Sequence, residues 1–413
     1  MTAKNIVVLG TLDTKGEQIL FLKQRITQRG HKAIVVDLSM GGTPLFQADI
    51  TPQEIARAAG KNIEQIVESR DRSMVTHVME SGTMKKIGEL YSNKKVDGIL
   101  AVGGASMALI GSHIMEALPF GVPKIIVCPA AIPAYINLWF TTKDVAIMQS
   151  IVEFAGLNEL LKDVLARAAG AICGMAEEAS PPGELRVPRG AIAITQFGFT
   201  DNCGKYVREY LEERGYSVYP FHAQGISDRA MDSLIEQGYF DGVIETAPGG
   251  VIEDIFEGHR AAGPKRLEAA GKRGIPQVIA PGSVNLTGCG ITRKHREKYA
   301  TRERVMKIDE IRAMTRFNDE ELRIGAKAYA EKLNQAKGRI SILFPLRGWS
   351  SLDRENSILY DPVQDRVFVE ELRKNLKPGI EMVDVDYNLE DPEFALALVE
   401  KLDFLYKNTD TVS

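Results

Sequence analysis

The stretch that decides the fold is "IVVLGTLDTKGEQILFLKQRITQRG", residues 6–30. It begins with a run of apolar residues, turns at Gly10, and continues with apolar residues at helical spacing. A short, almost wholly apolar strand followed by a helix is typical of a parallel sheet that helices cover on both faces. The stretch therefore predicts one strand–turn–helix unit of an α/β protein.

The same pattern recurs along the whole chain. The first half continues with "KAIVVDL", "GILAVGG" and "PKIIVCP", and the second half has "GAIAITQ", "YSVYPFH", "GVIETAP" and "PQVIAPG". Three short matches keep their order in both halves: an Arg-Gly pair before the second strand, an Asp-Gly pair before the third, and a Gly-x-Pro turn before the fourth. We interpret this order as a duplication, although any two parallel α/β units share such turns.

This repetition predicts two Rossmann-like parallel-sheet domains, residues 1–180 and residues 191–413. The segment 181–190 is rich in Pro and Gly and is the predicted linker. Ligands of such folds lie outside the carboxyl ends of parallel strands, so we expect a cleft between the two domains to hold the ligand.

Composition narrows the classes of function. At 413 residues the chain is longer than one hydrophobic core usually supports, which agrees with two domains. A net charge of -4 without a long Lys or Arg run argues against nucleic acid as a main partner. The four cysteines form no CxxC pair, and the start of the chain lacks the features of a signal peptide. The longest apolar stretch, residues 125–140, is interrupted by prolines, so we expect no membrane span and a cytoplasmic location.

The corner after the first strand is a candidate phosphate site. Between Gly10 and Gly16 the chain offers backbone amides, hydroxyls and one cation at a predicted helix N-terminus, groups that suit a phosphate. The candidate nucleotide ligands here are Gly10, Thr11, Asp13, Thr14 and Lys15, and Asp13 is also the candidate magnesium ligand. An alternative stays open, because Thr14 and Glu17 have the spacing of a capping box and Gly10 allows a tight turn. The stretch has neither the Walker-loop spacing nor the dinucleotide fingerprint.

Two further corners face the same edge of the predicted sheet. Gly103 and Gly104 allow a ligand to approach the backbone, and Ser106 begins a predicted helix with free amides. Asp37 ends the second strand, where an acidic residue often binds a ribose. These residues complete the candidate nucleotide site. The alternatives are a glycine pair that opens a tightly packed helix, and an Asp37 that only caps or turns.

The second half supplies the candidate catalytic residues. His222 ends a strand, where an imidazole that titrates near neutrality can act as an acid or base. Arg347 and Asp353 follow a late strand and suit the binding of a carboxylate or phosphate. Further candidate ligand groups at strand ends are Glu245, Ser283 and Asn285. A structural histidine and ordinary turn residues are the alternatives.

Several long blocks resemble one known family. They are "GTLDTKGEQ", "TTKDVAIMQSIVEFAGLNELLKDVLARAAGAICGM", "GPKRLEAAGKRGIPQVIAPG" and "GWSSLD". In order, they resemble the ATP-binding domain family typified by the N-terminal half of the tomato inhibitor of tobamovirus RNA replication. The resemblance implies two Rossmann-like subdomains, a homodimer, and ATP with magnesium in the first subdomain. Members also occur beside a TIM-barrel protein, so the resemblance implies such a partner as well. Its nucleotide contacts fall on the loop from Gly10 to Lys15 and on Gly103-Gly104.

The sequence departs from that family at its glycine loop. The family loop runs Gly-Gly-Ser-Gly-Gly-Thr, whereas residues 103–108 here are Gly-Gly-Ala-Ser-Met-Ala.

The sequence leaves three hypotheses about the function of the protein. The first is an ATP-binding protein, as an ATP-dependent enzyme on a small acidic metabolite. The second is an ATP-independent enzyme on an organic acid or acyl compound, and the third is a ligand-regulated dimeric binding protein. The sequence does not decide whether the protein is an enzyme.

Overall fold

The computed structural model describes residues 2–69, 71–130, 143–180 and 187–408. The chain divides into two compact units, residues 1–186 and 187–413. The predicted linker, 181–190, and the apolar stretch 125–140 both lie partly outside the described residues. The cleft predicted between the units stays a prediction. Within the described ranges, no helix is both long and apolar enough to cross a membrane.

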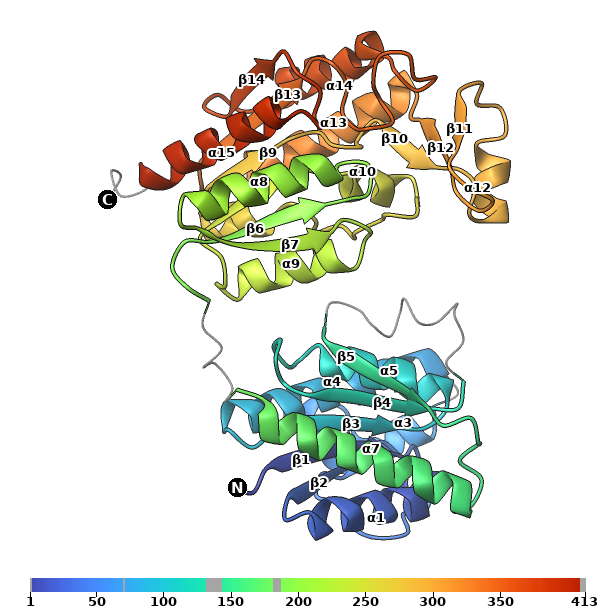
Figure 1. The fold of residues 1–413 in the computed structure, drawn as a ribbon. Helices are drawn as coiled ribbons and strands as arrows, with labels where there is room; N and C mark the ends of the chain where they lie inside the picture. The colour runs from blue at the N-terminus through green and yellow to red at the C-terminus, as the bar shows by residue number, and fades with distance from the viewer. Residues whose placement is uncertain (1, 70, 131–142, 181–186, 409–413) are drawn as a thin grey trace. The chain divides into compact units, whose positions relative to one another are not determined.

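The first unit is built on a five-stranded sheet with the order β2-β1-β3-β4-β5 (Figure 1), in which every neighbouring pair is parallel. Its strands are β1 (Asn5–Gly10), β2 (Lys32–Asp37), β3 (Gly98–Val102), β4 (Lys124–Cys128) and β5 (Val145–Gln149). The four strands predicted in this half are confirmed. The edge strand β5 was not predicted.

Helices cover both faces of this sheet. Successive β1 residues alternate between two cores, with Val7 and Leu9 in one and Ile6 and Val8 in the other. This alternation explains the continuous apolar run, because a strand buried on both faces has no polar side. Helices α1 (Leu12–Gln28) and α7 (Glu159–Glu178) pack on one face. The other face carries α2 (Pro52–Ala58), α3 (Ile63–Val67), α4 (Arg72–Ser92) and α5 (Ala105–Met115).

The second unit has a six-stranded sheet with the order β14-β13-β9-β8-β6-β7 (Figure 1), again with every pair parallel. Its strands are β6 (Ala191–Gln196), β7 (Ser217–His222), β8 (Gly242–Glu245), β9 (Gln277–Ile279), β13 (Ile340–Pro345) and β14 (Glu381–Val385). The predicted parallel α/β fold of both halves is confirmed. The order β7-β6-β8-β9 repeats the order β2-β1-β3-β4 of the first unit.

Helices also cover both faces of the second sheet. They are α8 (Asp201–Glu213), α9 (Ser227–Glu236), α10 (Gly250–Ile255), α11 (Ala269–Arg273), α13 (Asp319–Asn334), α14 (Pro362–Asn375) and α15 (Pro392–Lys407). A three-stranded antiparallel sheet, ordered β10-β12-β11, is inserted between β9 and β13. It consists of β10 (Leu286–Gly288), β11 (Val305–Lys307) and β12 (Ala313–Arg316), with α12 (Arg293–Lys298) between its strands.

The loop predicted between Gly10 and Gly16 is wrong in its extent. Helix α1 already begins at Leu12, and Lys15 (φ -128°, ψ 19°) is a kink inside it. Thr14 lies inside this helix and not at its N-cap, so the capping box proposed for Thr14 is also wrong. The N-cap residue is Thr11, which makes no side-chain cap hydrogen bond. The cap comes from the next strand instead, because the Asp37 carboxylate accepts a hydrogen bond from the Leu12 amide.

Candidate functional site

The first unit has a topological switch point between β1 and β3. Strand β2 lies on the far side of β1, so the chain leaves β1 and β3 in opposite directions at this point. Ligands of open α/β sheets bind in the crevice that such a reversal creates. The structure thus brings two predicted corners to adjacent strand ends, namely Gly10 after β1 and Gly103-Gly104 after β3.

Asp37 lies at the carboxyl end of β2, next to the strand β1 that borders this crevice. Its side chain is buried, and Oδ1 accepts hydrogen bonds from the Leu12 amide (3.0 Å) and from the amide and hydroxyl of Ser39 (2.9 Å for the amide). Among the residues that the structure describes, none donates to Oδ2. One carboxylate oxygen therefore caps α1, and the other can accept a hydrogen bond from a ligand.

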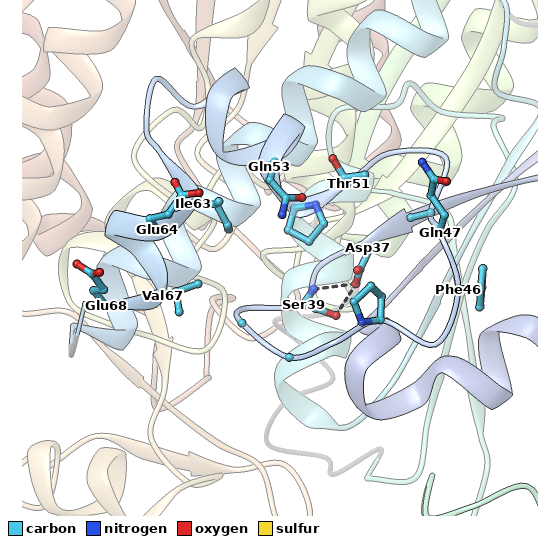
Figure 2. A pocket seen from close by; sticks show the side chains of 15 residues that line it. Asp37, Ser39, Phe46, Gln47, Thr51, Gln53, Ile63, Glu64, Val67 and Glu68 are labelled. Atoms are coloured by element: carbon cyan, nitrogen blue, oxygen red, sulfur yellow. Dashed lines mark hydrogen bonds between the residues drawn. The ribbon is translucent and has the colours of Figure 1, made fainter.

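A pocket of 550 Å³ lies at the carboxyl end of β2 (Figure 2). Asp37 and Ser39 form one side of it, and α3 stands on the opposite side. Its lining residues are Asp37, Ser39, Gly41, Gly42, Pro44, Phe46, Gln47, Ala48, Thr51, Pro52, Gln53, Ile63, Glu64, Val67 and Glu68. The lining combines apolar surface with hydrogen-bonding groups. It contains three carboxylates and neither Lys nor Arg, so it suits a neutral or hydroxyl-bearing group better than a phosphate.

Three of the remaining predicted ligands of the first corner, Thr11, Thr14 and Lys15, already have partners. Lys15 Nζ donates to the Phe154 carbonyl oxygen over 2.8 Å, and the hydroxyls of Thr11 and Thr14 are 2.7 Å apart. The Lys15 cation is therefore held by a backbone carbonyl of the segment after β5. Asp13 is half-buried, and its Oδ1 is buried without a partner. No group of three metal-binding side chains is found in the described ranges. Asp13 thus fits a magnesium ion only as one ligand beside phosphate oxygens.

The start of α5 is the candidate anion-binding element of this crevice. Gly104 is its N-cap and makes no side-chain cap hydrogen bond. A Cβ added at Gly104 would meet no atom within 4 Å, so the space beside the helix start is open. Helix N-termini bind anions through their free amides and dipole. Ser106 lies in this first turn and adds a hydroxyl.

The three candidate catalytic residues do not converge. His222 ends the edge strand β7 with an exposed side chain, and its ring centroid is 6.1 Å from that of Phe197. Arg347 and Asp353 follow β13, which three strands separate from β7. Four strand spacings correspond to about 19 Å. Arg347 is also exposed and forms an ion pair with Asp386 (2.8 Å). The structure therefore does not assemble one catalytic group from these side chains.

Asp353 belongs to a buried polar network. Its Oδ2 accepts hydrogen bonds from Asn285 Nδ2 (2.7 Å) and the Trp349 amide (2.9 Å). Asn285 also donates to Asp365, which forms an ion pair with Arg316. The carboxylates of Asp353 and Asp365 are both buried beside the Arg316 guanidinium. The network therefore holds the loops after β9 and β13 together. This arrangement indicates a structural role for Asp353.

Glu245 belongs to a second buried polar cluster, in which it accepts hydrogen bonds from Arg266. Arg266 is fully buried and donates to both carboxylate oxygens of Glu245, with Asp228 and Asp232 each 3.4 Å away. Burial and the neighbouring carboxylates raise the pKa of Asp232 to about 7, against the opposing effect of Arg266. The sequence analysis missed Arg266 and Arg316, since an isolated arginine carries no motif that separates a buried one from an exposed one.

Comparison with known proteins identifies the family. Two family models match the chain: the Uncharacterised protein family (UPF0261) N-terminal domain over residues 4–181, and the corresponding C-terminal domain over residues 189–406. The chain belongs to the UPF0261 family. A UPF0261 protein of Clostridium tetani is 34% identical over 400 residues, which cover 97% of this chain and 98% of that protein.

The family link expected from the sequence motifs is confirmed. The ToMV susceptible protein tm-1(GCR26) of Solanum lycopersicum is 25% identical over 418 residues, or 96% of this chain and 55% of the tomato protein. ATP binding, the homodimer and the TIM-barrel partner stay predictions.

A solved structure shows only a distant likeness to this UPF0261 member. It is the UDP-GlcNAc 2-epimerase of Methanocaldococcus jannaschii in complex with UDP-GlcNAc and UDP, 9% identical with a TM-score of 0.23, covering 67% of this chain and 83% of that chain. At that score the likeness carries no argument about ligands.

Proposed function

We propose that the N-terminal unit binds a nucleotide, with ATP and magnesium as the first candidates. The observation that carries the proposal is the 550 Å³ pocket beside the buried Asp37, at the carboxyl edge of the sheet and next to its switch point. In this proposal the ribose and base occupy the pocket, and the phosphates extend along the sheet edge toward the start of α5.

Asp37 supports the ribose end of this arrangement. Its Oδ2 can accept hydrogen bonds from vicinal hydroxyls, while Oδ1 stays engaged with α1 and Ser39. The apolar part of the lining, including Phe46, Ile63 and Val67, offers contact surface for a base. A sugar and base need few charged partners, which fits a pocket without Lys or Arg.

The phosphate end rests on α5. The ends of β2 and β3 are separated by two strand spacings, about 10 Å, which is a suitable span from ribose to phosphate. The free amides at Ala105 and Ser106 would bind phosphate oxygens. Asp13, with its unpartnered buried Oδ1, would be the protein ligand of a magnesium ion held mainly by those phosphates.

A thermal-shift titration with adenosine, AMP, ADP and ATP, each with and without magnesium, tests the proposal. Saturation at about a hundred times the dissociation constant would stabilise the protein by about 2.7 kcal/mol. We expect Val67→Trp, which fills the pocket from a residue 46% exposed, to abolish the shift with every one of these ligands. Val363→Trp makes the same change at a residue 77% exposed in the other unit, and we expect it to keep the shift.

A second variant tests the phosphate end separately. Gly104→Asp places a carboxylate at the α5 N-cap, where it would favour the helix but repel phosphate. It should weaken ATP far more than adenosine. The proposal is wrong if no adenine compound shifts the melting temperature, or if Val67→Trp leaves the shifts unchanged.

A further inference from the structure

The second unit has a small pocket of its own at the carboxyl ends of β13 and β14. It has a volume of 220 Å³ and lies between these strand ends and one face of α14. Asp365, Arg366, Val369, Glu370 and Arg373 form that face, with the spacing that places residues on one side of a helix. The adjoining side of α14 faces the core through buried residues such as Phe368 and Leu372.

The floor of this pocket is apolar and rigid. Phe344 and Trp349 are buried in the same hydrophobic core, with their ring centroids 6.3 Å apart. Val369 on α14 and Leu346 after β13 add aliphatic surface to the lining. A floor of this kind binds an aliphatic or aromatic group of modest size.

Asp365 lines this pocket from α14 and has one polar atom without a partner. Its side chain is buried, and Oδ1 accepts hydrogen bonds from Asn285 (2.8 Å) and from Arg316. Oδ2 is buried as well and has no partner. Burial and the nearby Asp353 raise the pKa of Asp365 to about 8, and Arg316 opposes this rise.

The rim carries charges of both signs that are not paired with each other. Arg366 and Arg373 are exposed on α14, and Glu370 and Asp384 are exposed beside them. In the described part of the chain, none of these four forms an ion pair within 4.0 Å. The nearby Arg347 and Asp386, which do not line the pocket, are by contrast paired at 2.8 Å.

We propose that this pocket binds a small zwitterion, an α-amino acid with an apolar side chain. The guanidinium groups of Arg366 and Arg373 bind its carboxylate. The carboxylates of Asp384 and Glu370 bind its ammonium group, and its side chain packs on Trp349. An organic acid without an amino group would face the two rim carboxylates unpaired, and a simple amine would face the two guanidinium groups. The proposal is independent of nucleotide binding in the other unit.

Isothermal titration calorimetry on the full chain tests the proposal with three ligands of one shape. L-leucine carries both charged groups, 4-methylpentanoate lacks the ammonium group, and 3-methylbutylamine lacks the carboxylate. We expect saturable binding of leucine, and at least tenfold weaker binding of each of the other two. Absence of saturable binding with leucine and with phenylalanine overturns the proposal, as does equally tight binding of 4-methylpentanoate.

Exposed variants locate the site without disturbing the core. Arg366→Gln and Asp384→Asn should each weaken leucine binding at least tenfold. Arg347→Gln and Asp386→Asn make the same changes in the neighbouring ion pair outside the pocket, and they should leave the affinity within twofold. If the control pair weakens binding as much as the rim pair, leucine does not bind in this pocket and the proposal fails.

Discussion

Asp37 caps α1 in this structure and would also contact the ligand in the proposed complex, and substitutions can separate these two roles. Asp37→Ala removes both carboxylate oxygens, whereas Asp37→Asn keeps Oδ1 as an acceptor and converts Oδ2 into a donor. Oδ1 accepts hydrogen bonds from the Leu12 amide and from Ser39, and Asp37 also lines the pocket. The alanine variant should therefore lose binding and much of its stability, and the asparagine variant should lose binding with only a small loss of stability.

The size of the stability loss follows from the groups left behind. Leu12 and Ser39 are 1% and 2% exposed, so in Asp37→Ala water cannot replace the lost acceptor well. Loss of an N-cap costs about 1 kcal/mol, and a hydrogen bond to a charged group contributes about 1.5–3 kcal/mol. We therefore expect Asp37→Ala to lower the free energy of unfolding by about 3 kcal/mol. Asp37→Asn should lower it by about 1 kcal/mol, because a neutral acceptor replaces a charged one.

Hydrogen exchange at the Leu12 amide gives a local measurement of this effect, which is useful because two units need not unfold together. Exchange should be much faster in Asp37→Ala and close to wild type in Asp37→Asn. Adenosine binding, followed by thermal shift, should be lost in both variants. An alanine variant with unchanged exchange at Leu12 would refute the cap, and an asparagine variant with wild-type affinity would refute the ribose contact.

Three further predictions concern the second unit. The pKa of Asp365 is raised from 3.8 to about 8, so the folded state binds more protons than the unfolded state between these values. The free energy of unfolding should therefore fall as pH rises from 4 to 8, by at most about 1.4 kcal/mol per pH unit from this group. Asp365→Asn should flatten that slope in urea titrations, and an unchanged slope would contradict the assignment. Gly348→Ala should cost about 3 kcal/mol, because φ is +101° and the new Cβ would come 1.7 Å from the Asp353 carbonyl oxygen. Gly379 has a similar φ of +99°, but a Cβ added there would meet no atom within 4 Å. Calorimetry on Gly379→Ala should therefore show a loss of stability of only about 1 kcal/mol. Equal losses for the two variants would mean that the clash with Asp353 is relieved. Arg266→Met should cost about 3–5 kcal/mol by leaving Glu245 charged and unpaired, and the double variant with Glu245→Gln should recover part of it. No recovery would show that packing of the arginine outweighs its charge.

The sequence revealed the strands because burial on both faces leaves a continuous apolar run, as in residues 6–9. It did not reveal β5, an edge strand whose burial is mixed. The start of α1 was misplaced because its cap lies 25 positions later in the chain, at Asp37. Such long-range caps leave no local signal.

The sites were harder to predict than the strands, for a related reason. Asp37, Gly10 and Gly103 were found because they end strands. The pocket wall formed by α3, and the α14 face that carries Asp365, come from segments without a recognisable motif. Asp353 looked like a ligand group in the sequence, but its partners Asn285 and Arg316 belong to distant segments and hold it in the interior.

The shared carboxylate of Asp37 also has a thermodynamic consequence. In the proposed complex, a ligand hydroxyl that donates to Asp37 and the first turn of α1 would depend on the same side chain. In the proposed nucleotide complex, any coupling between occupancy of the pocket and order at the helix start would be reciprocal, with the same free energy in both directions. In that complex, the carboxylate that caps α1 would also contact the ligand, so ligand binding would be measurable as a change in local unfolding at the beginning of α1.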